Sequence, residues 1–348
     1  MAVVNITIIG TGRIGASLGL ALQAYSKRGD AKHQFVVTGY DRKVARLRAA
    51  AKLGAVEAEV PEITNAVSRA DLVFLAMPYG EAKELYELMG AALKPGAVVV
   101  DTAPLKLPPQ AWADRHFPRD PEDGSAAAYL VGVLPVINPD YLGDPDDSPE
   151  GARADLFTGG LMILSPAANC PPEAVQLVSD LTELLGIRIH FVDPHEHDGI
   201  IAGTEGLPAL LQVAYFQSLS RANGWADAGW ISNPAFFLAT YKLLDSDPET
   251  LAAELHDNRA NLLRRIDALS AALHALRDTL THENSDALAD LIDESARKYR
   301  VWANQRERNK WETDIEPEAT EQGAKSRFSM LGFGSLLPSI GGRKKGKK

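Results

Sequence analysis

Cysteine is almost absent from this chain. Cys170 is the only cysteine among 348 residues, so no disulfide can form within the chain. A small secreted scaffold held together by disulfides is therefore excluded. So few thiols are typical of a reducing compartment, and we expect a cytoplasmic protein.

Long apolar runs are also lacking. No stretch approaches the ~20 consecutive apolar residues that a membrane-spanning helix needs. The chain enters an apolar segment at residues 3–9 without the charged region and cleavage site of a secretory signal. No Cys/His cluster has metal-ligand spacing, and no nucleophilic triad stands out. We expect no membrane span, no metal and no covalent nucleophile.

Basic residues are outnumbered by acidic ones. The chain has 36 Lys and Arg against 46 Asp and Glu, a formal net charge of −10. An acidic body argues against a core that binds nucleic acid. The last part, residues 313–348, loses hydrophobic periodicity and ends in a basic cluster. We interpret it as a disordered solubilising tail in preference to an RNA or lipid contact. The clustered cations are Arg343, Lys344, Lys345, Lys347 and Lys348.

Residues 1–193 alternate short apolar runs with amphipathic stretches. This alternation predicts a parallel, doubly wound α/β sheet. The run Val98-Val99-Val100 is typical of a strand that helices cover on both faces. Strands are predicted at residues 3–9, 35–40, 71–76, 97–101, 129–134, 161–164 and 187–192, and helices at residues 17–27, 44–53, 81–93 and 173–185. Residues 138–149, rich in Pro, Asp and Gly, are typical of a surface loop or a lid.

A helical period begins at residue 194. Residues 195–223, 234–244 and 251–308 predict long helices, so an all-α domain of residues 194–312 is expected. Apolar residues recur at helical spacing in its last part, which is typical of a core or a subunit interface. The stripe is therefore compatible with a subunit interface. This stripe comprises Leu262, Ile266, Leu269, Leu273 and Leu276.

A glycine-rich motif follows the first predicted strand and precedes a helix. In this context the spacing G-x-G-x-x-G predicts a loop that binds a dinucleotide. The first glycine permits a tight turn, the second lets the backbone approach a pyrophosphate, and the third lets helix and strand pack closely. The helix N-terminus offers N–H donors to the phosphates. We predict a Rossmann-type NAD(P)-binding domain, with a loop made of Gly10, Thr11, Gly12, Arg13, Ile14 and Gly15.

The residues after the second predicted strand bear on the choice of cofactor. Asp41 ends that strand, where a carboxylate hydrogen-bonds ribose hydroxyls and repels a 2′-phosphate. NAD is therefore favoured. Arg42 and Lys43 follow directly and would accommodate a 2′-phosphate, so NADP stays the alternative. Met77-Pro78 fits a loop that passes under the dinucleotide, unless Pro78 merely ends its strand.

Several further segments of the chain match short sequence motifs that occur together in one known family. Residues 8–19 resemble the pattern G-x-G-x-I-G-x-S-L, and residues 101–106, from Asp101 to Lys106, lie where D-x-x-S-x-K is expected. Residues 155–157 and 164–166 resemble D-L-F and L-T-P, and residues 193–198, which contain His197 and Asp198, resemble D-x-x-x-H-D. Together these segments resemble the prephenate and arogenate dehydrogenase family of tyrosine biosynthesis over residues 3–310.

The resemblance implies a Rossmann domain followed by a helical dimerisation domain. Together with the apolar stripe of the helical region, it predicts a homodimer. It also implies a small anionic substrate, a cyclohexadienol that carries a ring carboxylate. In that family a hydride leaves the ring for the nicotinamide, CO2 is lost and the ring becomes aromatic. The protein would then orient the substrate, hold its carboxylates and take the hydroxyl proton.

The family's histidines are missing here. Leu134 occupies the histidine position of the family's H-P-M, and leucine can neither accept a proton nor donate a hydrogen bond. Pro104 replaces the serine of D-x-x-S-x-K. Residues 205–209, Glu-Gly-Leu-Pro-Ala, stand where the family has S-H-L-P-H, so two further histidines are absent.

Several candidates for site residues remain. The resemblance places His197 at the nicotinamide pocket, where a neutral imidazole can act as general base, although a structural histidine is the alternative. Lys106 and Glu205 are candidates to assist it. The alternatives are a surface lysine for Lys106 and a carboxylate that only repels an anionic substrate for Glu205. Arg259 and Asp198 are predicted to bind substrate, a guanidinium being suited to a carboxylate. An ion pair with Asp257 or with another subunit is the alternative for Arg259. Asp101 completes the predicted cofactor site.

Three functions are compatible with these residues. The first is an NAD-dependent prephenate or arogenate dehydrogenase in which His197 replaces the missing base. The second is an NAD(P)-dependent enzyme for another small acidic or carbonyl substrate. The third is a dinucleotide-binding protein without catalysis, because fold alone does not fix function.

Overall fold

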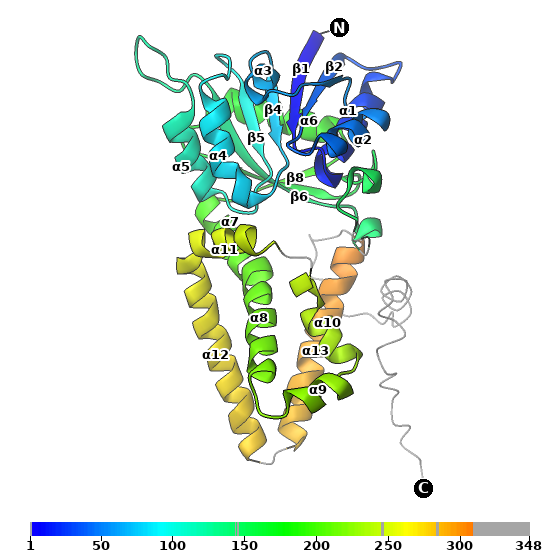
Figure 1. Ribbon diagram of the computed structural model, residues 1–348, viewed down its shortest axis with the longest axis vertical. Helices are drawn as coiled ribbons and strands as arrows, with labels where there is room; N and C mark the ends of the chain where they lie inside the picture. Colours follow the sequence, from blue (N-terminus) through cyan, green and yellow to red (C-terminus); the bar gives the residue numbers. More distant parts are fainter. Residues whose placement is uncertain (1, 143, 145, 245–246, 283–284, 309–348) are drawn as a thin grey trace. The chain divides into compact units, whose positions relative to one another are not determined.

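The computed structural model describes residues 2–142, 144, 146–244, 247–282 and 285–308 (Figure 1). The predicted tail, residues 313–348, lies outside these ranges. Within them, every helix is too short or too polar to traverse a bilayer.

The described strands form an eight-stranded sheet in the order β3-β2-β1-β4-β5-β6-β7-β8. Neighbouring strands run parallel except β6 and β7, which are antiparallel. The doubly wound α/β fold is thus confirmed. The strands are β1 (Ala2–Ile9), β2 (His33–Tyr40), β3 (Ala58–Glu59), β4 (Leu72–Leu75), β5 (Val98–Asp101), β6 (Tyr129–Val136), β7 (Leu161–Pro166) and β8 (Arg188–Phe191).

Helices connect these strands and continue after them. Up to β8 they are α1 (Arg13–Ser26), α2 (Val44–Lys52), α3 (Ile63–Val67), α4 (Tyr79–Gly90), α5 (Leu107–His116) and α6 (Pro172–Leu184). After β8 they are α7 (Pro194–Ile201), the π-helical turn η3 (Ala202–Gly206), α8 (Leu207–Ser220), α9 (Trp225–Ile231), α10 (Pro234–Thr240), α11 (Pro248–Asp257), α12 (Arg259–Thr281) and α13 (Ser285–Arg308). The described residues after Pro194 form only helices and their connections, which confirms the expected all-α region.

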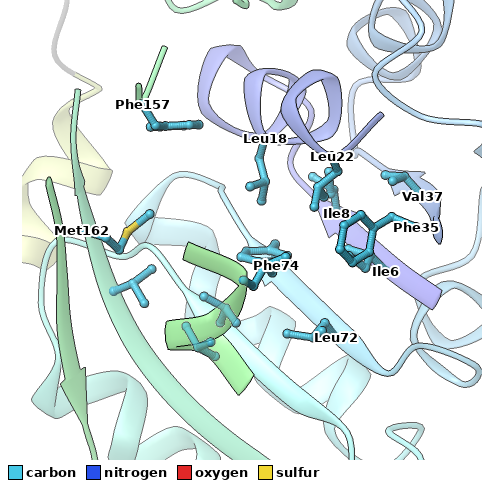
Figure 2. Packing of buried hydrophobic residues seen from close by; sticks show 14 of the residues in the cluster. Ile6, Ile8, Leu18, Leu22, Phe35, Val37, Leu72, Phe74, Phe157 and Met162 are labelled. Carbon is cyan, nitrogen blue, oxygen red and sulfur yellow. The ribbon is translucent and has the colours of Figure 1, made fainter. Parts of the chain in front are cut away.

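The core lies on both faces of the sheet. In β4, Phe74 belongs to the cluster on one face and Val73 to the cluster on the other. Helices α1 and α6 cover the first face, and α4 and α5 cover the second (Figure 1). Figure 2 shows Leu18 and Leu22 of α1 in the first cluster with Phe74. Burial of such side chains contributes about 1.5–3 kcal/mol each.

The strand order reverses direction at β1. Strand β1 pairs with β2 on one side and with β4 on the other. In an open parallel sheet, ligands bind beyond the carboxyl ends of the strands at such a reversal. The glycine motif follows β1 and the Met77-Pro78 segment follows β4, so both lie at this edge.

The contacts divide the chain into two compact units. Among the described residues, the first comprises 2–222 and 240–270, and the second 223–239 and 271–308. The first unit therefore contains the sheet, α7, α8, α11 and the first part of α12. Within the second unit the rings of Trp225 and Phe236 lie 6.2 Å apart, and Trp230 is 91% exposed.

Cys170 is half-buried just before α6 and packs against the first core cluster. Burial raises the pKa of its thiol to about 11. The thiol is therefore protonated at neutral pH, and a protonated thiol is a poor nucleophile.

Candidate active site

The glycine motif forms a tight turn between β1 and α1. Gly10 has φ of +89°, a conformation that favours glycine, and its N–H donates to Tyr40 O over 2.9 Å. A Cβ on Gly10 would lie 2.2 Å from Ala76 O, and one on Gly15 would lie 2.0 Å from Gly10 O. These positions admit no side chain, so the motif is needed for the close approach of β1, α1 and the segment after β4.

Asp41 is hydrogen-bonded to this turn. Its Oδ2 accepts from Thr11 N over 2.8 Å and from Thr11 Oγ1 over 3.0 Å, and its Oδ1 accepts from Lys43 N over 2.8 Å. A carboxylate offers about four acceptor positions. Asp41 therefore retains capacity for a ribose hydroxyl at the end of β2.

The cations after Asp41 differ in their partners. Arg42 pairs with two carboxylates of α4, Glu81 at 3.4 Å and Glu84 through a shorter contact. Arg46, by contrast, forms no side-chain ion pair or hydrogen bond with the described part of the chain. Its Nη1 lies 4.0 Å from the position that a Cβ on Gly12 would occupy. Arg46 is thus the unpaired cation beside the glycine turn.

Arg13, at the start of α1, is 6% exposed. Its main-chain N–H donates to Asp147 O over 3.0 Å, and its guanidinium donates to the main-chain oxygen of Asp144 over 2.6 Å. The loop after β6 therefore contacts the turn in which phosphate donors are expected.

His197 lies in the first turns of α7 and is 3% exposed. Its Nδ1 lies 3.2 Å from Asp198 Oδ1, and its buried Nε2 has no hydrogen-bond partner among the described residues. Burial lowers the pKa of the imidazole, an effect that Asp198 opposes and Lys106 reinforces. A neutral ring with Nδ1–H directed at the carboxylate would leave Nε2 free to accept a proton.

Asp198 is buried and fixes the start of α5. Its Oδ1 accepts from Lys106 N over 2.7 Å and its Oδ2 from Leu107 N over 3.1 Å. Its main-chain oxygen accepts from Asn258 Nδ2 over 2.8 Å. This arrangement caps α5 and ties α7 to the junction of α11 and α12. The predicted contact of Asp198 with substrate stays a prediction.

Lys106 is 1% exposed and lies after β5. Its ammonium donates to Ala103 O and to Val133 O, the latter over 2.7 Å. Burial lowers the pKa of Lys106 to about 8, although Asp101 and Asp198 oppose the shift. Lys106 thus joins the β5–α5 connection to β6, and its predicted role in catalysis stays a prediction.

Asp101, which the sequence assigned to the cofactor site, is buried at the end of β5. It accepts from Tyr86 Oη over 2.6 Å and from Ala103 N over 2.7 Å. Burial raises its pKa, and the nearby Lys106 and the hydroxyl of Tyr86 lower it. These contacts hold the turn after β5.

Tyr79 begins α4 and donates to Asp257 Oδ2 over 2.8 Å. Burial, followed by the hydrogen bond to Asp257, raises the pKa of its phenol. Tyr79 is therefore no base near neutral pH. Arg259 is exposed and donates to His256 O over 3.2 Å, so it forms no ion pair with Asp257. The contact of Arg259 with substrate stays a prediction.

Glu205 lies in the π turn between α7 and α8. It is exposed, whereas His197 earlier in the same helical run is buried. Desolvation raises the pKa of Glu205, and the charge of Lys242 opposes the shift. Desolvation and, after it, the charge of Glu205 raise the pKa of Glu254. π turns are frequent at functional sites, which agrees with the prediction for Glu205 without testing it.

Apolar groups fill the positions of the absent histidines. Leu134 is half-buried and packs against the core on the α4–α5 face of the sheet. A Cβ on Gly206 would lie 2.7 Å from Cδ2 of Leu262, a buried residue of α12. A histidine at 206 would therefore collide with Leu262.

Sequence reasoning missed three residues of this region. Arg46 lies in the first turn of the helix after Asp41, Tyr79 lies directly after Met77-Pro78, and Asn258 joins two helices. The positions of Arg46 and Tyr79 at the carboxyl edge of predicted strands were a usable signal. The contact of Asn258 with α7 was not, because it joins segments far apart in the sequence.

Two models of a single family match this chain. The model for "Prephenate dehydrogenase, nucleotide-binding domain" matches residues 24–191. The model for "Prephenate dehydrogenase, dimerization domain" matches residues 193–294. The two matches meet where the sheet ends and the helices begin.

Curated relatives match over most of their length. A cyclohexadienyl dehydrogenase of Zymomonas mobilis is 26% identical over 299 residues, which cover 84% of this chain and 93% of the relative. A prephenate dehydrogenase of Bacillus subtilis is 23% identical over 299 residues, which cover 85% of this chain and 75% of the relative.

Solved structures share the fold. Prephenate dehydrogenase from Aquifex aeolicus, in complex with hydroxyphenyl propionate and NAD+, has a TM-score of 0.71 at 19% identity. The match covers 86% of this chain and 99% of that chain. Arogenate dehydrogenase from Synechocystis has a TM-score of 0.64 at 20% identity, with the same coverage. With the two family models, these matches show that the chain belongs to the prephenate dehydrogenase family.

Proposed function

We propose that this chain is an NAD-dependent dehydrogenase of prephenate or arogenate, which catalyses oxidative decarboxylation in tyrosine biosynthesis. The observation that carries the proposal is the state of His197. It is a buried imidazole with one nitrogen directed at Asp198 and the other without a partner among the described residues. Such a group suits proton abstraction near neutral pH.

The residues at the carboxyl edge of β1 fit NAD. The turn at Gly10 and Gly12 leaves no side chain between α1 and an approaching phosphate. Asp41 stands where a ribose would be bound, and Glu81 and Glu84 neutralise Arg42. The nearest cation after Asp41 is thereby withdrawn from a 2′-phosphate, which supports NAD over NADP. Met77 and Pro78 follow β4 beside the same turn.

The division of labour in the reaction follows from these positions. NAD, when bound, supplies the ring that accepts the hydride. His197 Nε2 takes the proton of the substrate hydroxyl, and Asp198 keeps Nδ1 protonated and stabilises the imidazolium that forms. Asp198 itself is fixed by the N–H groups of Lys106 and Leu107, so the base does not need to reorganise.

Fewer contacts in the structure bear on substrate binding than on the base. We propose that Arg259 binds a substrate carboxylate, since its guanidinium has a single contact, to a main-chain oxygen. Glu205 remains a candidate to assist the base. Leu134 and the filled space at Gly206 favour a second candidate function, the oxidation of another small acid on the same scaffold.

Assembly and location complete the proposal. We propose that residues 1–193 bind the cofactor and that residues 194–312 carry substrate contacts and form a homodimer. The family model of the second region is described as a dimerization domain, and large apolar side chains such as Trp230 and Ile231 are exposed. A monomer in light scattering would contradict the dimer. A cytoplasmic location stays part of the proposal.

The test is formation of reduced nicotinamide, followed by absorbance, with prephenate and separately with arogenate. We expect turnover with at least one acid and a large loss in His197→Ala. If wild-type protein turns over neither acid faster than His197→Ala, the proposed reaction is wrong. Calorimetry with NAD and NADP on the same preparation then separates a different substrate from a protein that only binds the dinucleotide.

A further inference from the structure

A main-chain oxygen accepts an N–H at the start of α1, directly after the glycine turn. Asp147 O accepts the N–H of Arg13, at the first residue of α1, over 3.0 Å. The same oxygen lies 3.3 Å from the position that a Cβ on Gly12 would occupy. In a Rossmann turn, N–H groups at this helix start bind the pyrophosphate. One phosphate donor is therefore already used by the protein itself.

An acidic side chain strengthens this contact. Asp144 Oδ2 lies 3.2 Å from Nη2 of Arg13, and the main-chain oxygen of Asp144 accepts from Nη1. The guanidinium of Arg13 is buried, whereas the carboxylate of Asp144 is one-third exposed. A carboxylate on an arginine beside the helix start has the charge that a phosphate would bring. We call residues 144 and 146–148 the strap.

The strap is anchored by buried contacts on its C-terminal side. Ala152 packs with Ala16 of α1 and Ala50 of α2 in a small apolar cluster. Arg153 N donates to the buried Oγ of Ser17 in α1 over 2.9 Å. Ser148 N donates to Asp146 Oδ1 over 2.9 Å, which shapes the turn of the strap itself. These contacts hold the strap against α1 and leave residue 144 as its charged attachment.

We infer that the strap is an internal competitor of the dinucleotide, and that the cofactor's pyrophosphate binds only after the strap has left Arg13 N. The inference deepens the proposed function and depends on its cofactor site. The apparent affinity for NAD is then reduced by the fraction of molecules in which the strap is closed. Weakening the attachment of the strap must tighten NAD binding, which is the reverse of what loss of a binding residue does.

Asp144→Asn tests this directly, because it removes the negative charge that pairs with Arg13 and keeps the size of the side chain. Glu150→Gln is the matched control, since Glu150 is exposed on the same loop and its carboxylate has no described partner. Calorimetry with NAD should show a Kd about fivefold lower in Asp144→Asn and an unchanged Kd in Glu150→Gln. Equal or weaker binding by Asp144→Asn would overturn the inference.

Hydrogen exchange gives a second readout on wild-type protein. We expect NAD to speed exchange at residues 146–148 while it slows exchange at residues 10–15. Protection of both segments by NAD would mean that the strap closes over the cofactor, which contradicts competition. Neither readout uses turnover, so a protein that binds NAD but oxidises neither acid refutes the proposed reaction and leaves the strap result standing. Failure of wild type and Asp144→Asn to bind millimolar NAD would overturn both.

Discussion

His197 and Asp198 are adjacent in the sequence and interact through their side chains, with Nδ1 of the imidazole 3.2 Å from Oδ1 of the carboxylate. The same Oδ1 accepts the main-chain N–H of Lys106. The carboxylate that orients the histidine is therefore held by the start of α5. Such an arrangement fixes the tautomer of the base, and a main-chain N–H rather than a further side chain holds the carboxylate in place.

Replacement of His197 by Gln should lower kcat by about 100-fold or more, because general base catalysis contributes that much. His195→Gln is the matched control, since His195 is exposed two positions earlier in the same helix. Its kcat should stay within about twofold of wild type. Equal losses in the two variants would remove His197 from the role of base.

The lowered pKa of His197 fixes the direction of the pH dependence. A base must be unprotonated to act, and burial holds its pKa below the ordinary value of 6.5. The acid limb of kcat/KM should therefore have its midpoint below pH 6.5. A profile whose acid limb lies above pH 7 would contradict His197 as the titrating group.

The lowered pKa of Lys106 predicts that the free energy of unfolding changes with pH in the alkaline range. Its pKa is about 8 in the folded chain against 10.5 for the free side chain. Between these values the unfolded chain binds more protons, so the free energy of unfolding rises with pH there. The contribution of Lys106 should be about 1.5 kcal/mol between pH 8 and 9.5, and the raised pKa of the Cys170 thiol offsets part of it in the total. Urea unfolding of Lys106→Met should lack it, whereas Lys94→Met should keep it.

Arg46 should contribute to cofactor affinity. As the unpaired guanidinium beside Gly12, it can donate a charge-assisted hydrogen bond to a phosphate. Arg46→Gln should raise the Kd for NAD about tenfold. Arg48 is exposed in the same helix, and Arg48→Gln should leave the Kd unchanged. A similar loss in both variants would indicate only a general effect of charge.

Gly132 is required by the packing of Lys106. A Cβ on Gly132 would lie 2.8 Å from Cδ of Lys106 and 3.1 Å from Ser165 O. Gly132→Ala should lower the free energy of unfolding by about 1–3 kcal/mol, the usual cost of overpacking. Gly29→Ala is the control, because a Cβ there meets nothing within 4 Å. Comparable stability of the two variants would show that Lys106 can move aside.

Much of the sheet was predictable because its strands are apolar throughout and its turns carry glycine. The prediction missed α5, where Pro108 and Pro109 suggest a break. In the structure these prolines lie in the first turn, where the missing N–H groups are not needed. The strand predicted to end at Leu134 continues through Pro135. Pro135 lies beyond the part of β6 that pairs with β5, and it pairs in register with Met162 of β7.

The candidate site was predictable only in part. The glycine turn and Asp41 were found because their chemistry is local in the sequence. The partners of Lys106, Asp101 and Asp198 were not, because they join β5, β6 and α7 and depend on which groups are buried together. The sequence showed that Gly206 replaces a histidine of the family. It did not show that Leu262 of α12 packs against Gly206, because that contact joins two helices far apart in the sequence.

Cys170 has a practical consequence for experiments in solution. Its thiol is half-buried and protonated at neutral pH, so it should react slowly with maleimides. The native chain should therefore take up little label, so that cysteines introduced elsewhere can be labelled selectively. Two introduced cysteines, one at Ser148 and one at an exposed position of α2 such as Arg48, would accept a fluorophore pair. Energy transfer between them would follow the distance between loop and helix in real time as nucleotide is added.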